Sequence, residues 1–107
     1  MSIRTIIKQT GIICVSVMAL AVAGNSVAGD ASAGKAKSGL CTGCHGTDGM
    51  SMSPMIPNLA GQKEAYLAKA IKDYKTGVRK DPMMSSMTGG LTDNEIDDLA
   101  AYFSGLK

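Results

Sequence analysis

Large aromatic side chains are almost missing from this sequence. Its 107 residues include no tryptophan, one phenylalanine (Phe103) and three tyrosines. Aromatic rings bury more surface than most other side chains, and a small domain without them has little with which to fill its interior. We therefore expect a large apolar group that is not part of the polypeptide to complete the core.

An excess of charge of either sign is also missing. The chain has eleven Lys and Arg against nine Asp and Glu, and two of the basic residues, Arg4 and Lys8, lie in a leader that we expect to be removed. The remaining charges balance. This balance argues against nucleic acid as a partner, because nucleic-acid-binding domains concentrate Lys and Arg on one face.

No hydrophobic run is long enough to cross a membrane as a helix. The apolar run from Ile12 to Ala23 would form a helix of roughly 18 Å, whereas the hydrocarbon core of a bilayer is roughly 30 Å thick. Basic residues precede this run, and the small residues Ser26 and Ala28 follow it, which is the layout of a secretory signal. We predict that residues 1–28 are a signal peptide cut after Ala28, with a cut after Ala23 as the second choice and a retained anchor as the alternative.

Export would leave residues 29–107 as one domain in the periplasm. Cys14 would be lost with the leader, so Cys41 and Cys44 would be the only cysteines of the mature chain. A domain of this size gains little net stability from an apolar core alone. A bound group is again expected to contribute.

The sequence predicts an all-α domain with about three helices. The first is expected from about Ala31 to Cys44, and the second over residues 62–76, where apolar residues share one stripe. The segments 46–61 and 78–90 are expected to be long loops: the first is rich in turn-forming residues, and in the second Pro82 lies early and Gly89-Gly90 closes the segment. Loops of this length in so small a domain indicate that a ligand organises them.

The last predicted helix has the clearest signals at its ends. Thr92 can cap its first turn, and Glu95 follows three residues later to complete a capping box. Gly105 is expected to end the helix. The residues expected on its buried stripe are Ile96, Leu99, Ala100 and Phe103.

The stretch Cys41-Thr42-Gly43-Cys44-His45 contains both cysteines and the only histidine of the predicted domain. Cys-x-x-Cys-His is the attachment signature of c-type haem: the two thiols form thioether bonds to the haem vinyl groups, and the histidine binds the iron. A redox dithiol is the first alternative, but it is expected beside a strand-helix-strand unit. A zinc site is the second, but it would need four ligands.

The iron ligand on the face opposite His45 is not fixed by the motif. That position could stay open, bind another protein group or take a methionine sulfur, since no second histidine exists. Met50, Met52 and Met55 follow His45 closely and are expected to pack within their loop. A second group of methionines comes about forty residues after His45 and can reach the opposite haem face: Met83, Met84 and Met87.

The domain resembles the short bacterial class I c-type cytochromes, in particular one half of the periplasmic two-haem cytochromes with tandem domains. The resemblance spans residues 29–107 and implies a class I cytochrome c fold wrapped around a single covalently bound haem. It is carried by Cys41–Gly46, Pro57–Gly61, Tyr66-Leu67, Asp73-Tyr74, Gly77, Leu91–Asp93 and Ala100–Phe103.

The resemblance also implies site residues. In that family the methionine ligand generally lies seven residues before the leucine that opens the terminal helix, which gives Met84 here, with Met87 or Met83 as alternatives. The carbonyl of Pro57 would accept the free ring N–H of His45. Arg79 or a tyrosine could meet a haem propionate, although solvated or packed roles are at least as well supported.

These features together predict a one-electron carrier, not an enzyme, that cycles between Fe(II) and Fe(III). The implied partners are membrane-bound respiratory complexes or periplasmic redox enzymes, met transiently. The alternative is a haem enzyme or a gas or redox sensor with an open or labile distal position. Lysines could steer docking, although a solvated helix face is the better interpretation; they are Lys63, Lys69, Lys72, Lys75 and Lys80.

Overall fold

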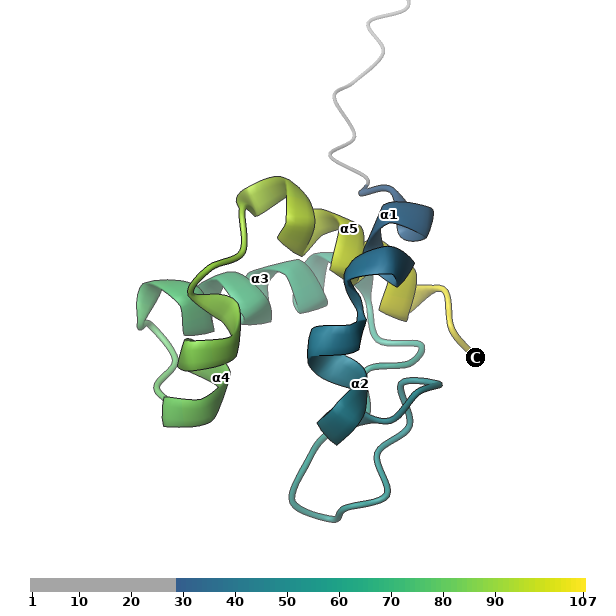
Figure 1. The fold of residues 1–107 in the computed structure, drawn as a ribbon, viewed down its shortest axis with the longest axis horizontal. Coiled ribbons are helices and arrows are strands. Elements are labelled where there is room, and N and C mark those ends of the chain that lie inside the picture. Colours follow the sequence, from purple (N-terminus) through teal and green to yellow (C-terminus); the bar gives the residue numbers. More distant parts are fainter. Residues whose placement is uncertain (1–28) are drawn as a thin grey trace, which may run out of the picture.

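A computed structural model describes residues 29–107, which fold into five α-helices with no β-strand among these residues (Figure 1). The predicted signal peptide and Cys14 lie outside the described part of the chain. The all-α class is confirmed, but the expected number of about three helices is wrong. The helices are α1 (Ala31–Lys37), α2 (Gly39–His45), α3 (Glu64–Thr76), α4 (Pro82–Thr88) and α5 (Asp93–Ser104).

The first predicted helix is two helices that meet at Ser38. Asp30 caps α1 by accepting hydrogen bonds from the backbone N–H groups of Ser32 and Ala33. The Ser38 hydroxyl donates to the carbonyl oxygen of Lys35 at 2.7 Å, which satisfies an end carbonyl of α1 locally, and Gly39 follows. The chain can therefore change direction between α1 and α2 (Figure 1).

The predicted loop over residues 78–90 is wrong, because it contains α4. Asp81 caps this helix by accepting from the N–H groups of Met83 at 3.0 Å and Met84 at 2.9 Å. Pro82 occupies the first helical position, where its fixed φ suits a helix and its missing N–H costs nothing. The proline that we took as a sign of a loop therefore begins a helix.

The ends and the buried stripe of the last helix are as predicted. The Thr92 hydroxyl accepts from the N–H of Glu95 at 3.2 Å, and the Glu95 carboxylate accepts from the N–H of Thr92 at 3.1 Å, forming the capping box. Gly105 follows the last turn. The buried core consists of Leu67, Leu91 and the four stripe residues Ile96, Leu99, Ala100 and Phe103.

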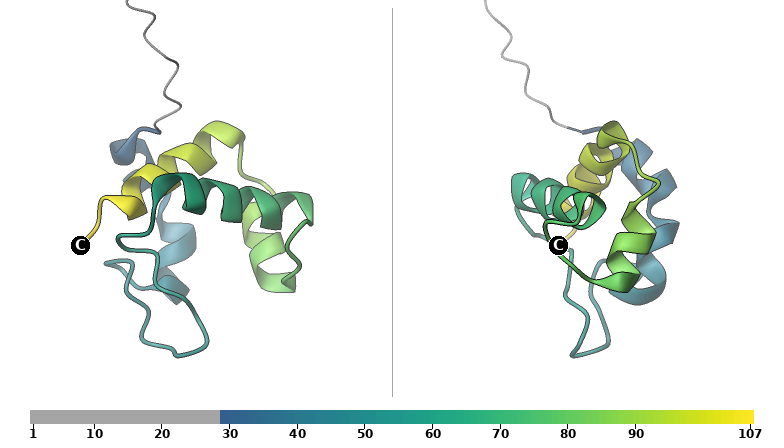
Figure 2. Two further views of the ribbon diagram at one scale, coloured as in Figure 1. Left: turned by 180° about the vertical axis from the view of Figure 1, so that it is seen from behind. Right: turned by 90° about the vertical axis from the view of Figure 1, so that its left-hand side faces the viewer.

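The helices α1, α3 and α5 form the upper part of the molecule in Figure 1, and α2 and α4 descend from it on opposite sides. Figure 2 shows the same arrangement from behind and from the side. The crossing of α1 and α5 is close, because a Cβ atom added at Gly34 would lie 2.0 Å from the carbonyl oxygen of Asp98. The core therefore sits between α1, α3 and α5, above the space that α2 and α4 flank.

The other predicted loop, residues 46–61, is confirmed and connects α2 to α3. It folds back on itself where the N–H groups of Leu59 and Ala60 both donate to the carbonyl oxygen of Gly49, at 2.8 and 3.0 Å. None of the helices between residues 29 and 107 is sufficiently long and apolar to cross a membrane.

Candidate haem-binding site

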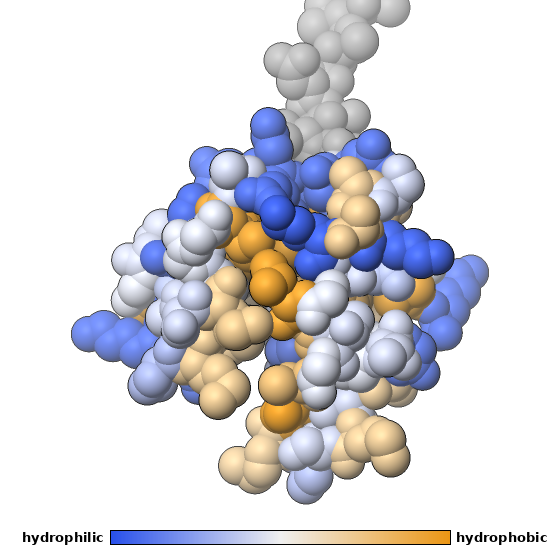
Figure 3. Space-filling view, viewed as in Figure 1, coloured by the Kyte–Doolittle hydropathy of each residue, from blue (hydrophilic) through white to orange (hydrophobic). Residues whose placement is uncertain are grey.

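A cavity of about 500 Å³ opens below the core, between α2, α4 and the loop that connects α2 to α3. Its floor includes the core residues Leu67, Leu99 and Phe103. Figure 3 shows apolar side chains gathered in the hollowed middle of this face. Apolar side chains at its rim remain exposed: 47 % of Leu40, 67 % of Met83 and 41 % of Met87. The domain thus has a large apolar cavity next to its core, as expected if a bound apolar group completes the core.

The Cys-x-x-Cys-His motif lies on α2 and lines this cavity with all three of its functional side chains. Cys41 is half-buried against the core, Cys44 is exposed, and His45 is buried. Neither cysteine forms a disulfide. Burial raises the pKa of the Cys41 thiol, so this sulfur stays protonated against the apolar floor. One turn of helix thus brings both thiols and the imidazole to one wall.

The imidazole of His45 lies beside the backbone carbonyl of Pro57. Its Nδ1 atom lies 2.8 Å from the Pro57 carbonyl oxygen. A carbonyl oxygen can only accept, so Nδ1 carries the proton and donates, and Nε2 keeps its lone pair for a metal. The loop reaches this position because Gly46, with φ 91°, follows His45; a Cβ atom there would lie 2.1 Å from the carbonyl oxygen of Met50.

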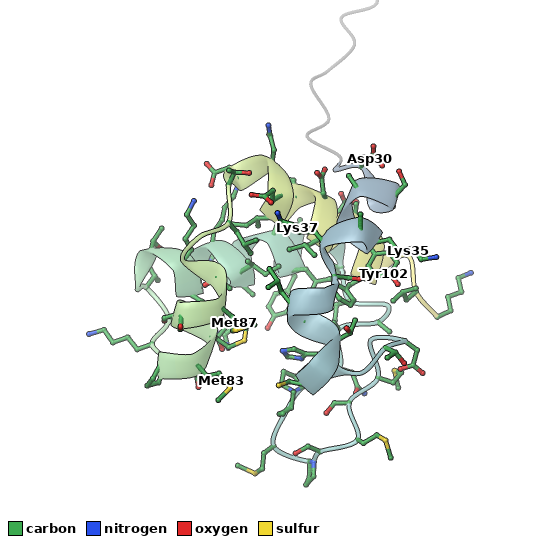
Figure 4. The ribbon with its side chains drawn as sticks, viewed as in Figure 1. Asp30, Lys35, Lys37, Met83, Met87 and Tyr102 are labelled. Atoms are coloured by element: carbon green, nitrogen blue, oxygen red, sulfur yellow. The ribbon has the colours of Figure 1, made fainter. Side chains whose placement is uncertain are left out.

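Three methionines on α4 line the cavity wall opposite α2: Met83, Met84 and Met87. Figure 4 shows Met83 and Met87 on α4, with Met87 extending toward the side occupied by α2. Met84 is the least exposed of the three. The carbonyl oxygen of Met84 accepts a hydrogen bond from the Thr88 hydroxyl at 2.8 Å. The structure thus brings His45 and the second methionine group to one cavity.

The methionines of the connecting loop do not pack as expected. Met50 is 46 % exposed, Met55 is 87 % exposed and Met52 is fully exposed. Of the three, only Met55 lines the cavity. The loop closes through backbone and side-chain hydrogen bonds, among them the Ser51 N–H to the Asn58 amide oxygen at 2.7 Å, and not through packing of these thioethers.

Arg79 and Tyr74 form a further part of the cavity wall. The guanidinium carbon of Arg79 lies 4.6 Å from the centroid of the Tyr74 ring, a cation–π contact that holds the charge at the edge of the cavity. Asp81 also lines the cavity, and sequence reasoning missed its role. The pair Asp81-Pro82 could have revealed it, because an aspartate before a proline is a common helix start.

The residues of this cavity fit haem better than the alternatives. Two free thiols, an imidazole with Nε2 available and thioethers on the facing wall match the chemistry of covalent attachment and iron ligation. Within residues 29–107, no three His, Cys, Asp or Glu side chains gather as a zinc ion would need. The strand-helix-strand unit expected beside a redox dithiol is not found in this part of the chain either.

Comparison with known proteins supports the same assignment. A family model described as Cytochrome c matches residues 31–107. Cytochrome c-554(548) of Halomonas halodenitrificans is 50 % identical over 69 residues, covering 62 % of this chain and 83 % of the relative. The cytochrome subunit of sulfide dehydrogenase of Chlorobaculum tepidum is 42 % identical over 67 residues, covering 63 % of this chain and 60 % of the relative.

A solved structure has the same fold. Reduced recombinant cytochrome c4 from Pseudomonas stutzeri superposes with a TM-score of 0.71 and 45 % identity, over 75 % of this chain and 47 % of the other. The chain therefore spans about half the length of that protein, as the resemblance to one half of a tandem cytochrome implied. The chain belongs to the cytochrome c family: it is a c-type cytochrome that carries electrons and is not an enzyme, with haem c attached covalently through Cys41 and Cys44 of the motif that His45 completes.

Proposed function

We propose that His45 and Met84 are the two axial ligands of the haem iron. Both side chains line the cavity, one from α2 and the other from α4. Met84 is more buried than Met83 and Met87. Its position on α4 is held by the Asp81 cap, which accepts from the Met84 N–H at 2.9 Å, and by the Thr88 hydroxyl. The cap accepts from Met83 as well, so the lower exposure of Met84 is the observation that favours it over its two neighbours.

With both axial positions taken by protein, this chain would serve as a one-electron carrier. The bound haem supplies the Fe(II)/Fe(III) couple, and a methionine ligand raises its reduction potential. The Pro57 carbonyl keeps the His45 ring in one orientation, as outer hydrogen-bond partners of metal-bound histidines do. The α4 cap holds the thioether, and the apolar floor excludes water.

We further propose that the chain works in the periplasm and meets its redox partners transiently. The signal-like leader supports export. The relative that is the cytochrome subunit of a sulfide dehydrogenase supports a periplasmic dehydrogenase as electron donor, and a membrane-bound respiratory complex is the proposed acceptor. The exposed apolar rim formed by Leu40, Met83 and Met87 suits brief contacts through a small interface.

The ligand assignment is tested by the near-infrared absorption of the ferric protein, where iron bound to a thioether gives a weak band. We expect Met84→Ala to abolish this band, because no sulfur would then be held at the iron. Met83→Ala and Met87→Ala are the matched controls on the same helix and should keep the band. Persistence of the band in Met84→Ala, or its loss in one of the controls alone, would reject Met84 as the ligand.

A further inference from the structure

The start of the described chain is anchored by carboxylates from two helices. The backbone nitrogen of Gly29 donates to Oε1 of Glu64, the first residue of α3, at 3.2 Å. The next backbone nitrogen, of Asp30, donates to Oδ1 of Asp98 on α5 at 2.8 Å. Two successive backbone nitrogens thus donate hydrogen bonds to carboxylates that lie 35 and 68 positions further along the sequence. Figure 4 marks Asp30 where the chain enters α1.

Gly29 itself is packed against the backbone of α5. A Cβ atom added at this residue would lie 2.0 Å from the carbonyl oxygen of Asp97 and 2.5 Å from the backbone nitrogen of Asp98. These are main-chain atoms of a helix and cannot move aside. The site therefore accepts a glycine only, and the close approach fixes the Gly29 nitrogen beside the Glu64 carboxylate.

We propose that the leader is cut between Ala28 and Gly29, and that the α-ammonium freed on Gly29 forms an ion pair with Glu64 that fastens the start of α1 to α3 and α5. Hydrolysis adds one water across this amide: the carboxylate stays on Ala28, and the protonated amine stays on Gly29. Small residues at Ser26 and Ala28 suit the peptidase that removes such leaders. An uncharged amide that donates one hydrogen bond becomes a cation with three N–H groups beside a carboxylate, and charged hydrogen bonds are the stronger kind.

The charges around the freed amine favour its protonated form. The Glu64 carboxylate faces it from α3, and the Asp98 carboxylate accepts from the adjacent nitrogen of Asp30 from α5, whereas Asp97 approaches Gly29 through its backbone. Asp97 is also within 3.7 Å of the Lys72 amine, whereas the Asp30 carboxylate is engaged by the first turn of α1. An α-amine has an ordinary pKa near 8. The pair needs both the protonated amine and the ionised Glu64 carboxylate, so its stabilisation should be present near neutral pH and be lost as the pH rises through the titration of the amine.

The position of the cut is tested by the intact mass and N-terminal sequence of the protein isolated from the periplasm. We expect a chain that begins at Gly29 and carries one haem. A chain that begins elsewhere, or that retains the leader, would overturn the proposal. This outcome is independent of the ligands of the iron, so it does not depend on the proposed function.

The ion pair is tested by a double-mutant cycle on the holoprotein. One change is Glu64→Gln, and the other inserts Thr-Gln between Ala28 and Gly29. The cut after Ala28 then keeps its small residues, no such pair precedes Gly29, and the Gly29 nitrogen stays an amide after processing. With the native terminus, we expect Glu64→Gln to lower the melting temperature by roughly 1–5 °C at pH 7, the range of a partly exposed ion pair in a domain of this size. In the extended chain, or at pH 10, the same substitution should have less than half this effect.

Equal losses in both chains, or a loss that does not change between pH 7 and pH 10, would overturn the pairing. Mass spectrometry confirms the terminus of each preparation before the comparison. Gly29→Ala gives a second test, because it should displace the terminus and remove the effect of Glu64→Gln. Its matched control is Gly39→Ala, where an added Cβ atom meets nothing within 4 Å and the effect of Glu64→Gln should remain. An unchanged effect in Gly29→Ala would count against the pairing.

Discussion

At the scale of single residues, the orientation of the His45 ring depends on a backbone atom, which a substitution can disturb only indirectly. The His45 ring is oriented by a backbone carbonyl, at 2.8 Å from Nδ1, and that carbonyl is in place only because the loop after α2 turns sharply at Gly46. With φ 91° and a Met50 carbonyl oxygen in the space of a side chain, Gly46 satisfies both a conformational and a steric requirement.

Gly46→Ala should therefore disturb the site, although residue 46 touches neither sulfur nor imidazole. We expect a loss of at least about 2 kcal/mol in the free energy of unfolding, from the left-handed backbone conformation and the displaced Met50 carbonyl together. The matched control is Gly43→Ala, inside the same motif, where an added Cβ atom meets nothing within 4 Å. Denaturant unfolding of both holoproteins checks this prediction, and equal stabilities would contradict it.

At the scale of elements, α4 is the part of the fold that presents the proposed ligand. It has only seven residues, so its own hydrogen bonds give it little stability. Its start is fixed by Asp81, which accepts from the N–H groups of Met83 and Met84, and by Pro82. The start of α4, and with it the position of Met84, thus depends on this cap.

Asp81→Ala should loosen the Met84 thioether without changing any atom proposed to touch iron. Loss of such a cap costs about 1 kcal/mol, and the near-infrared band should therefore disappear at a lower denaturant concentration than in the wild type. Asp81→Asn should behave as the wild type, because asparagine caps helices equally well. Identical band-loss midpoints for the alanine variant and the wild type would rule out a role for the cap.

A second element-scale interaction joins α1 to the first turn of α5. Lys37 forms an ion pair with Glu95, and Figure 4 shows Lys37 extending toward this end of α5. The hydrogen bond from Lys37, followed by that from the Thr92 backbone, lowers the pKa of Glu95 to about 2. A lowered carboxyl pKa means that the ionised form stabilises the folded state.

Glu95→Gln should consequently destabilise the protein in a pH-dependent way. The stabilisation by ionised Glu95 is present above its ordinary pKa of about 4.5 and is lost as the pH falls toward 2. We expect the melting temperature of the variant to lie below that of the wild type at pH 6 and to converge with it near pH 2. A difference that stays constant over this range would show that the carboxylate charge is not the cause.

The sequence predicted a helix correctly where the signals for its ends and its buried face lie within that segment. The prediction failed where the structure of a segment depends on contacts with other parts of the chain. The last helix was predicted with its capping box and its buried residues because Thr92, Glu95 and the apolar stripe lie within one helix. The break at Ser38 was missed, since serine is tolerated inside helices and its hydrogen bond to the Lys35 carbonyl is seen only in the folded chain. The helix α4 was missed because Pro82 was taken to break a helix rather than to begin one.

In the site, too, residues that are adjacent in sequence were predicted, and residues brought together by the fold were not. The covalent motif Cys41–His45 was evident because its residues are adjacent in sequence. The residues alone narrowed the facing ligand to three methionines, and the resemblance then selected Met84, because the distances of these side chains from the iron depend on the three-dimensional path of α3 and α4. Arg79 and Tyr74 were not assigned, since only the folded chain shows that both line the cavity.

At the scale of the whole molecule, the haem is part of the interior of the protein. Within residues 29–107, six buried apolar residues form the core, and the cavity of about 500 Å³ lies directly against it. The scarcity of aromatic residues is explained by this arrangement, because the porphyrin provides the large flat apolar surface that the chain lacks.

The charges of the whole molecule favour a solvated surface over a docking patch. Three of the five lysines considered for steering are within 4 Å of carboxylates on α3 or α5, which reduces the field that they project. The pairs are Lys69 with Asp73 at 2.5 Å, Lys72 with Asp97 at 3.7 Å and Lys75 with Asp93 at 3.7 Å. The interpretation of a solvated helix face is therefore better supported than electrostatic steering.

The most direct test of an electron carrier with both iron positions closed is the absorption spectrum of the reduced protein before and after carbon monoxide is added. If His45 and Met84 hold the two axial positions, the spectrum stays unchanged over the first minutes, because no site is free for the gas. An immediate shift of the main haem absorption would contradict the account, since it would show an open or labile position of the kind that a sensor or a haem enzyme needs.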